Sequence, residues 1–183
     1  VAWHKLFNHD VSRVFKNHGI RLIDGCESVN SLQSLTMLRS LDADLFISIT
    51  GNQIFKKPLL DIPRLGTLNL HTALLPKYRG LMPSFWVLKN REKNTGVSVF
   101  FVDEGIDSGP ILVQKKINIE NISQWELISM TKFLGMEAII EGIELIQSGD
   151  YELIPNNEEE STYYSFPTRQ DVIDFKKGGN RFF

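Results

Sequence analysis

Asn69 and His71 are the residues whose types and spacing could most directly do chemistry, and they stand two positions apart in LNLHTALLPKYRG, residues 68–80. Alternate side chains of a β-strand point to the same face, so both polar groups would share one face and the neighbouring leucines the other. In open α/β sheets, ligands bind at the carboxyl ends of the strands. The pattern indicates a site where this strand ends. In the alternative, structural interpretation, Asn69 caps the following loop and His71 hydrogen-bonds to backbone.

A second polar segment, VDEGIDSGP at residues 102–110, also follows an apolar strand pattern. It carries three acids, Asp103, Glu104 and Asp107. Aspartate and glycine are common turn residues, so these acids could serve the turn alone. If the two segments instead meet at one edge of a sheet, an asparagine, a histidine and an aspartate would share a cleft.

Such a trio would suit acyl transfer, in which a tetrahedral intermediate carries a negatively charged oxygen. The Asn69 amide can donate a hydrogen bond to that oxygen, which is worth roughly 3 kcal/mol of barrier. His71 can move a proton near neutral pH, and Asp107 can orient the imidazole, favour its cationic form or hold a relay water. A covalent nucleophile is not indicated, because Cys26 lies in another segment and no serine stands in a Gly-x-Ser-x-Gly pattern.

Composition sets broad limits on the class of protein. The chain has 183 residues, of which 42% are hydrophobic and 23% charged, as expected for one globular domain. The net charge of −2 gives no overall reason to expect a nucleic-acid binder. The single cysteine excludes a disulfide within the chain and argues against a cysteine-based metal site, so no metal is predicted and a reducing cytoplasm is the expected location. No apolar run is long enough to cross a bilayer, so no membrane contact is expected.

The elements that must position these residues follow from hydrophobic spacing. Helical spacing is found at residues 3–17, 28–43, 82–92, 123–149 and 169–177. Strand patterns are found at residues 20–23, 44–50, 67–71, 96–103 and 111–119, and the second of these reads as a buried strand. Ser123 and Glu126 form a capping-box pattern before the longest helix. The alternation predicts an α/β domain with a mostly parallel central sheet flanked by helices.

The two quoted segments, extended to NLHTALLPKYRGLMPSFWVLKN and TGVSVFFVDEGIDSGPILVQ, resemble the folate-dependent formyltransferase family. That family includes methionyl-tRNA formyltransferases, glycinamide ribonucleotide transformylases and amino-sugar N-formyltransferases. The resemblance is dense from Asp44 to Gln114. It implies a Rossmann-like formyltransferase domain over residues 1–150 and a short C-terminal extension over residues 151–183. The family's first strand and its glycine-containing turn are not visible, so the domain is expected to lack that unit.

The resemblance also implies roles for individual residues. Asn69, His71 and Asp107 match the family's catalytic trio, and the formyl donor would be 10-formyltetrahydrofolate as co-substrate. Its pterin would lie between the loops at residues 51–55 and 102–107, with the Leu-Leu-Pro loop at the border. The residues implied in donor binding are Gln53, Ile54, Phe55, Leu75, Pro76, Asp103, Glu104 and Gly105. For Ile54 and Phe55, plain core packing is the alternative.

The amine that accepts the formyl group is less constrained. The LLPKYRG loop resembles the methionyl-tRNA branch, but the tail offers no obvious set of phosphate-neutralising cations, so a nucleotide-linked amino sugar is the first prediction and methionyl-tRNA the alternative. Phe100 stands where the purine enzymes hold a histidine, which weakens the glycinamide ribonucleotide alternative. Aromatic residues near the site could stack on a sugar or base, or could pack a helix onto the sheet: Tyr78, Phe85 and Trp86.

Two further alternatives are a formyltetrahydrofolate hydrolase, with water in place of the amine, and a non-catalytic folate-binding remnant. The complete trio argues against the remnant. The oligomeric state stays open.

Overall fold

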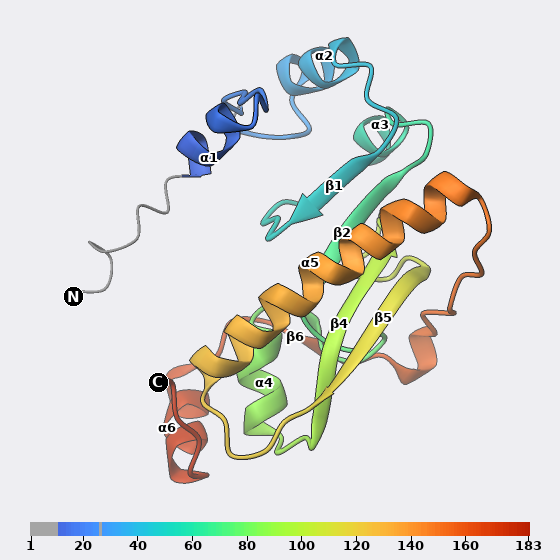
Figure 1. Ribbon diagram of the computed structural model, residues 1–183. Coiled ribbons are helices and arrows are strands. Elements are labelled where there is room, and N and C mark those ends of the chain that lie inside the picture. Colours follow the sequence, from blue (N-terminus) through green and yellow to red (C-terminus); the bar gives the residue numbers. More distant parts are fainter. Residues whose placement is uncertain (1–10, 26) are drawn as a thin grey trace.

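The computed structural model describes residues 11–25 and 27–183 (Figure 1). Of the first predicted helix, the part from Val11 to Asn17 is present as α1, and residues 3–10 lie outside the described residues. Cys26 lies outside them as well. Within the described part of the chain, no helix is long and apolar enough to cross a membrane. The cytoplasmic location stays a prediction.

One four-stranded sheet positions the site, with strand order β1-β2-β4-β5. Its strands are β1 (Phe46–Ile49), β2 (Thr67–His71), β4 (Asn94–Phe101) and β5 (Ile111–Asn118). The α/β class is confirmed. The sheet is mixed, because β1 and β2 pair in parallel whereas β2–β4 and β4–β5 pair antiparallel. The mostly parallel sheet that the alternation predicted does not form at β4–β5, because residues 102–110 are too few for the crossover that a parallel pair needs.

The long helix α5 (Gln124–Ser148) lies across one face of the sheet (Figure 1). The predicted capping box at its start is confirmed, because Ser123 accepts from the Glu126 amide and the Glu126 side chain accepts from the Ser123 amide. Leu68 is fully buried in the core between sheet and helix. The core residues there are Leu68, Val97, Val99, Leu112, Val113, Ala138 and Ile139. Since side chains alternate along β2, Asn69 and His71 face away from α5.

A second core joins α4 (Pro83–Lys89) to α6 (Arg169–Lys177) and the start of α5. The Phe85 and Phe175 rings stack with centroids 4.7 Å apart, and both side chains are buried. Trp86 packs edge-on against Phe85 and donates its indole N–H to the Ser165 carbonyl. Phe85 and Trp86 therefore pack α4 onto its neighbours, which is the structural alternative for these two aromatic residues.

The C-terminal extension packs on the rest of the chain. Its strand β6 (Tyr163–Tyr164) pairs in parallel with β3 (Arg79–Gly80) in a separate two-stranded sheet. A 3₁₀ helix, η2 (Glu158–Glu160), precedes β6. α6 begins with a capping box between Thr168 and Asp171 and is anchored by Phe175. This packing brings the extension to the carboxyl end of β2.

The N-terminal elements lie beyond β1, away from α4 and α6 (Figure 1). They include α2 (Leu32–Ser40), whose N-cap is Ser31, and the short α3 (Lys57–Leu60) follows β1. The prediction of a strand at residues 20–23 is wrong, because these residues form no strand in the structure and pair with none of the described strands, and Ile20 and Leu22 are half exposed. The strand predicted at residues 44–50 forms as β1, but it is not buried between two neighbouring strands. Among the described strands it lies at the edge of the sheet and pairs with β2.

Candidate active site

The site begins with the ring of His71, the last residue of β2. His71 is 6% exposed, and its Nε2 atom lies 2.7 Å from the carbonyl oxygen of Tyr78. A carbonyl can only accept, so Nε2 carries a proton and donates it to this bond. Tyr78 reaches the ring from a left-handed backbone conformation, with φ 62°. The contact fixes the ring and leaves Nδ1 as the nitrogen that faces a neighbouring carboxylate.

Asp107 supplies the carboxylate beside that nitrogen. Its Oδ2 lies 3.5 Å from His71 Nδ1 and accepts a hydrogen bond of 2.8 Å from the backbone N–H of Gly80. Both side chains are largely buried, at 7% and 16% exposed. A carboxylate next to Nδ1 can stabilise positive charge that develops on the ring during a reaction, so the geometry suits the pair to accept and return a proton at Nδ1.

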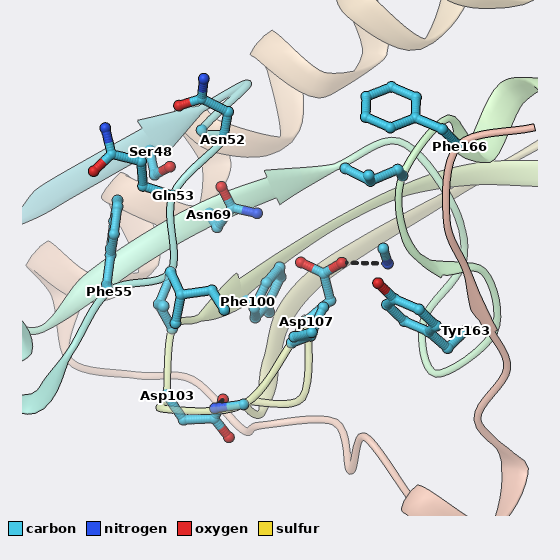
Figure 2. A pocket seen from close by; sticks show the side chains of 17 residues that line it. Ser48, Asn52, Gln53, Phe55, Asn69, Phe100, Asp103, Asp107, Tyr163 and Phe166 are labelled. Carbon is cyan, nitrogen blue, oxygen red and sulfur yellow. Dashed lines mark hydrogen bonds between the residues drawn. The ribbon is translucent and has the colours of Figure 1, made fainter. Parts of the chain in front are cut away.

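Asn69 contributes an amide from the same strand face. In the register of the sheet it stands opposite Ser48 of β1 and Phe100 of β4. Its side chain hydrogen-bonds to none of the residues that the structure describes, although it lines a cavity. Figure 2 shows Asn69 and Asp107 pointing into this cavity from two different elements. An unpaired amide facing a cavity is available to hydrogen-bond a ligand.

The cavity has a volume of about 350 Å³, within the range of small-molecule sites. One wall is the loop after β1, the other is the loop after β4, and buried Phe100 lies at its base. Residues from the C-terminal extension close a third side (Figure 2). Its lining residues are Ser48, Gly51, Asn52, Gln53, Ile54, Phe55, Asn69, Gly80, Leu81, Phe100, Val102, Asp103, Gly105, Ile106, Asp107, Tyr163 and Phe166.

Five of the eight residues implied in donor binding line this cavity: Gln53, Ile54, Phe55, Asp103 and Gly105. Ile54 is 60% exposed, so its side chain is not part of the core. Leu75 lies beneath the cavity, where it is buried against Phe100. Pro76 and Glu104 are not among the lining residues. The structure thus brings most of the implied set together and leaves these three outside.

Two of the lining side chains also hold the loops in shape. Gln53 donates to the carbonyl of Glu27 and accepts from the amide of Val29. Asp103 accepts from the amide of Gly105 and from the hydroxyl of Ser108, the turn chemistry that was its structural alternative. A ligand in the cavity would therefore meet loops whose conformations are already fixed.

Other residues of the site were missed from the sequence. Tyr163 and Phe166 lie far from the catalytic motifs along the chain, and their only sequence signal was the aromatic cluster TYYSF. Arg79, which belongs to the LLPKYRG loop, is 5% exposed and pairs with Glu158. Burial, followed by the hydrogen bond from its hydroxyl to Glu92, raises the pKa of Tyr78 well above its ordinary value.

An α/β domain in which an asparagine and an aspartate line one cavity, with a histidine beside the aspartate, has an arrangement suited to acyl transfer. The sequence matches the formyl transferase family over residues 5–142, and the chain belongs to that family. It is 34% identical over 177 residues to a methionyl-tRNA formyltransferase of Kosmotoga olearia, across 95% of this chain and 57% of the relative. The chain thus spans about half the length of the curated relatives that it matches.

Solved structures share the fold. A sugar N-formyltransferase from Shewanella sp. superposes with a TM-score of 0.69 at 20% identity, covering 93% of this chain and 71% of that one. The N-formyltransferase from Helicobacter canadensis, solved with folinic acid and dTDP-3-aminofucose, gives 0.65 at 26% identity, covering 87% and 54%. The Rossmann-like formyltransferase fold expected from the resemblance is confirmed.

Proposed function

We propose that this chain carries the catalytic domain of an N-formyltransferase, which moves a formyl group from 10-formyltetrahydrofolate to a primary amine. The observation that carries the proposal is the arrangement of three side chains, two of which line one cavity while the third lies beside them. The amide of Asn69, which hydrogen-bonds to none of the described residues, and the carboxylate of Asp107 line the cavity, and His71 Nδ1 lies 3.5 Å from that carboxylate. Residues 151–183 form part of the same catalytic unit, because Tyr163 and Phe166 line the cavity too.

The donor fits the cavity in size and in chemistry. A flat pterin can lie between the loop at residues 51–55 and the loop at residues 102–107, with the Phe100 ring below. Gln53, Ile54, Phe55, Asp103 and Gly105 would border it, while Leu75 supports the base from beneath. The folinic acid bound by the Helicobacter relative supports a folate here.

When bound, the folate supplies a formyl group on its N10 atom. As the acceptor nitrogen bonds to the formyl carbon, the Asn69 amide donates a hydrogen bond to the formyl oxygen, where negative charge develops. His71 Nδ1 takes the proton that the amine loses, and the adjacent Asp107 carboxylate stabilises the imidazolium. His71 then returns that proton to N10 as the bond from N10 to the formyl carbon breaks. The ring does not turn during these steps, because Nε2 stays bonded to Tyr78.

For the acceptor, we infer methionyl-tRNA ahead of a nucleotide-linked amino sugar. The support is the 34% identity to a methionyl-tRNA formyltransferase across 95% of this chain, against 26% for the Helicobacter enzyme solved with an amino sugar. This order reverses the prediction made from the sequence, which rested on the charge of the tail. The amino sugar stays the second candidate because the exposed aromatic side chains of Tyr163 and Phe166 line the cavity and could stack on a sugar or base.

The test offers 10-formyltetrahydrofolate together with either methionyl-tRNA or a panel of nucleotide-linked amino sugars, and measures formylated product by mass spectrometry. Product from the tRNA supports the first acceptor, and product from a sugar alone replaces it with the second. Formate released without any acceptor would instead identify a hydrolase. Tight folate binding with no turnover would identify a non-catalytic folate-binding protein. Either of these two outcomes, formate release without an acceptor or binding without turnover, would overturn the proposal.

A further inference from the structure

Asn156, in the C-terminal extension, hydrogen-bonds to the backbone of Asp107 and to that of Gly109, two residues further on. Its Nδ2 atom donates to the carbonyl oxygen of Asp107 at 2.9 Å and to that of Gly109 at 2.8 Å. Both hydrogens of one side-chain amide are therefore used on the loop that presents the carboxylate. The side chain is itself partly buried.

The orientation of that amide is set by Arg79. The Arg79 guanidinium donates to Asn156 Oδ1 at 3.0 Å and to the Asn156 carbonyl at 3.2 Å. Arg79 is buried and also pairs with Glu158, so it cannot swing away cheaply. Because a guanidinium can only donate, Oδ1 must face Arg79 and Nδ2 must face the loop.

The loop needs such a restraint because Asp107 has a φ of 50°, in the left-handed region that residues with a Cβ rarely adopt. Neighbouring contacts must hold it there. Gly80 does so through its N–H on Oδ2, and Asn156 does so through the two carbonyls. Arg79 and Gly80 thus both restrain Asp107. Arg79 acts through Asn156, which binds the Asp107 backbone, and Gly80 binds the Asp107 carboxylate directly.

The same extension also holds the residue that fixes His71. Thr162 accepts a hydrogen bond from the Tyr78 N–H at its hydroxyl, and one from the Arg79 N–H at its carbonyl, both at 2.8 Å. Tyr78 in turn accepts from His71 Nε2. Contacts made by residues 156–162 therefore reach both members of the His71–Asp107 pair.

We propose that Asn156 is a positioning residue of the formyl-transfer site, which holds the Asp107 carboxylate against His71 Nδ1; this inference rests on the proposed function. Asn156 does not line the cavity, so it acts on the reaction only through the loop. Substituting it should lower kcat more than it raises the KM for folate, because Asp107 acts in the reaction itself, whereas the loop after β1, the other wall of the donor cavity, is untouched.

The test compares Asn156→Asp with Asn157→Asp. The first keeps the shape of the side chain and removes the donors that face the two carbonyls. The second makes the same chemical change at an exposed neighbour that caps nothing at the start of η2. We expect Asn156→Asp to lower kcat by about 10- to 100-fold, since a misplacement of about 1 Å can have this effect. We expect Asn157→Asp to behave like the wild type.

A second readout does not depend on turnover. Amide hydrogen exchange of residues 103–109 should become faster in Asn156→Asp and stay unchanged in Asn157→Asp, with the exchange of α5 the same in all three proteins. Unchanged kcat with unchanged loop exchange would overturn the proposal, and so would faster exchange over the whole chain. If the wild type itself transfers no formyl group, the proposed function fails. The restraint of Asp107 by Asn156 is tested separately, because unchanged exchange of residues 103–109 in Asn156→Asp would refute it whether or not the protein is active.

Discussion

The Nδ1 atom of His71 lies 3.5 Å from Oδ2 of Asp107, while the opposite ring nitrogen is bonded to the Tyr78 carbonyl. His71 is the last residue of β2, and Asp107 lies in the loop that follows β4, the antiparallel neighbour of β2 in the sheet. This relationship assigns the two ring nitrogens different tasks: Nε2 anchors the ring, and Nδ1 is left for proton transfer beside the cavity.

Removing either partner of this pair should abolish most of the turnover. We expect His71→Ala and Asp107→Asn to lower the single-turnover rate by about 10²- to 10⁴-fold, the usual contribution of a positioned acid–base group. Circular dichroism melts should show both variants folded. A rate like that of the wild type in either variant would remove that residue from the mechanism.

Asn69 should matter for the rate more than for folding. Its amide hydrogen-bonds to none of the described residues, so Asn69→Ala breaks no hydrogen bond within that part of the chain. If the amide stabilises the developing oxyanion, the substitution should raise the barrier by about 3 kcal/mol. The measurement is kcat together with the melting temperature. A large loss of stability, with kcat preserved at low temperature, would argue for a structural role instead.

Gly80 should tolerate no side chain. It has a φ of 93°, and an added Cβ would collide with the Tyr164 carbonyl and lie 2.7 Å from the Tyr163 ring. Gly80→Ala should therefore disrupt the β3–β6 pair as well as the N–H contact with Asp107.

Gly149→Ala is the matched control, because Gly149 also has a positive φ, of 72°, with open space around it. It should lose about 1–2 kcal/mol from backbone strain alone, and Gly80→Ala should lose clearly more in urea unfolding. Equal losses would show that the β3–β6 contact contributes nothing.

Stability at low pH should depend on Asp171. Hydrogen bonds from the Thr168 hydroxyl, followed by the one from Lys89, lower the pKa of Asp171 to about 2. A folded pKa below the unfolded value stabilises the fold above about pH 4, and this stabilisation disappears as the pH falls toward 2. Asp171→Asn should therefore flatten the dependence of the melting temperature on pH between about 4 and 2. Asp174→Asn, one turn away on α6, is the control, and an identical flattening there would refute the assignment to Asp171.

Much of the site's position could be predicted from local pattern. The period of two along β2 separates Leu68 from Asn69 and His71, and burial of the leucine face under α5 decides which face carries the polar pair. The capping box of α5 could also be predicted from the sequence, because its contacts span only a few residues. The alternation of helices and strands did not predict the strand directions correctly, because the antiparallel pairing of β4 with β5 depends on the short loop at residues 102–110.

Long-range partners could not be predicted from the sequence. Arg79 looks like part of a surface basic loop, and only the folded chain shows it buried against Asn156 and Glu158. The contributions of Tyr163 and Phe166 to the cavity likewise depend on how β6 pairs with β3. Single-sequence patterns carry no record of contacts between residues so far apart.

The most direct test of the central claim is a single-turnover reaction with 10-formyltetrahydrofolate labelled with ¹³C in the formyl group. The wild type and His71→Ala would be compared with methionyl-tRNA as acceptor and with the amino-sugar panel, and labelled N-formyl product and labelled formate would both be measured. We predict that the wild type places the label on the amine nitrogen and that His71→Ala retains the label on the folate. Label found only in formate, or equal transfer by both proteins, would contradict the claim that this site formylates an amine through His71.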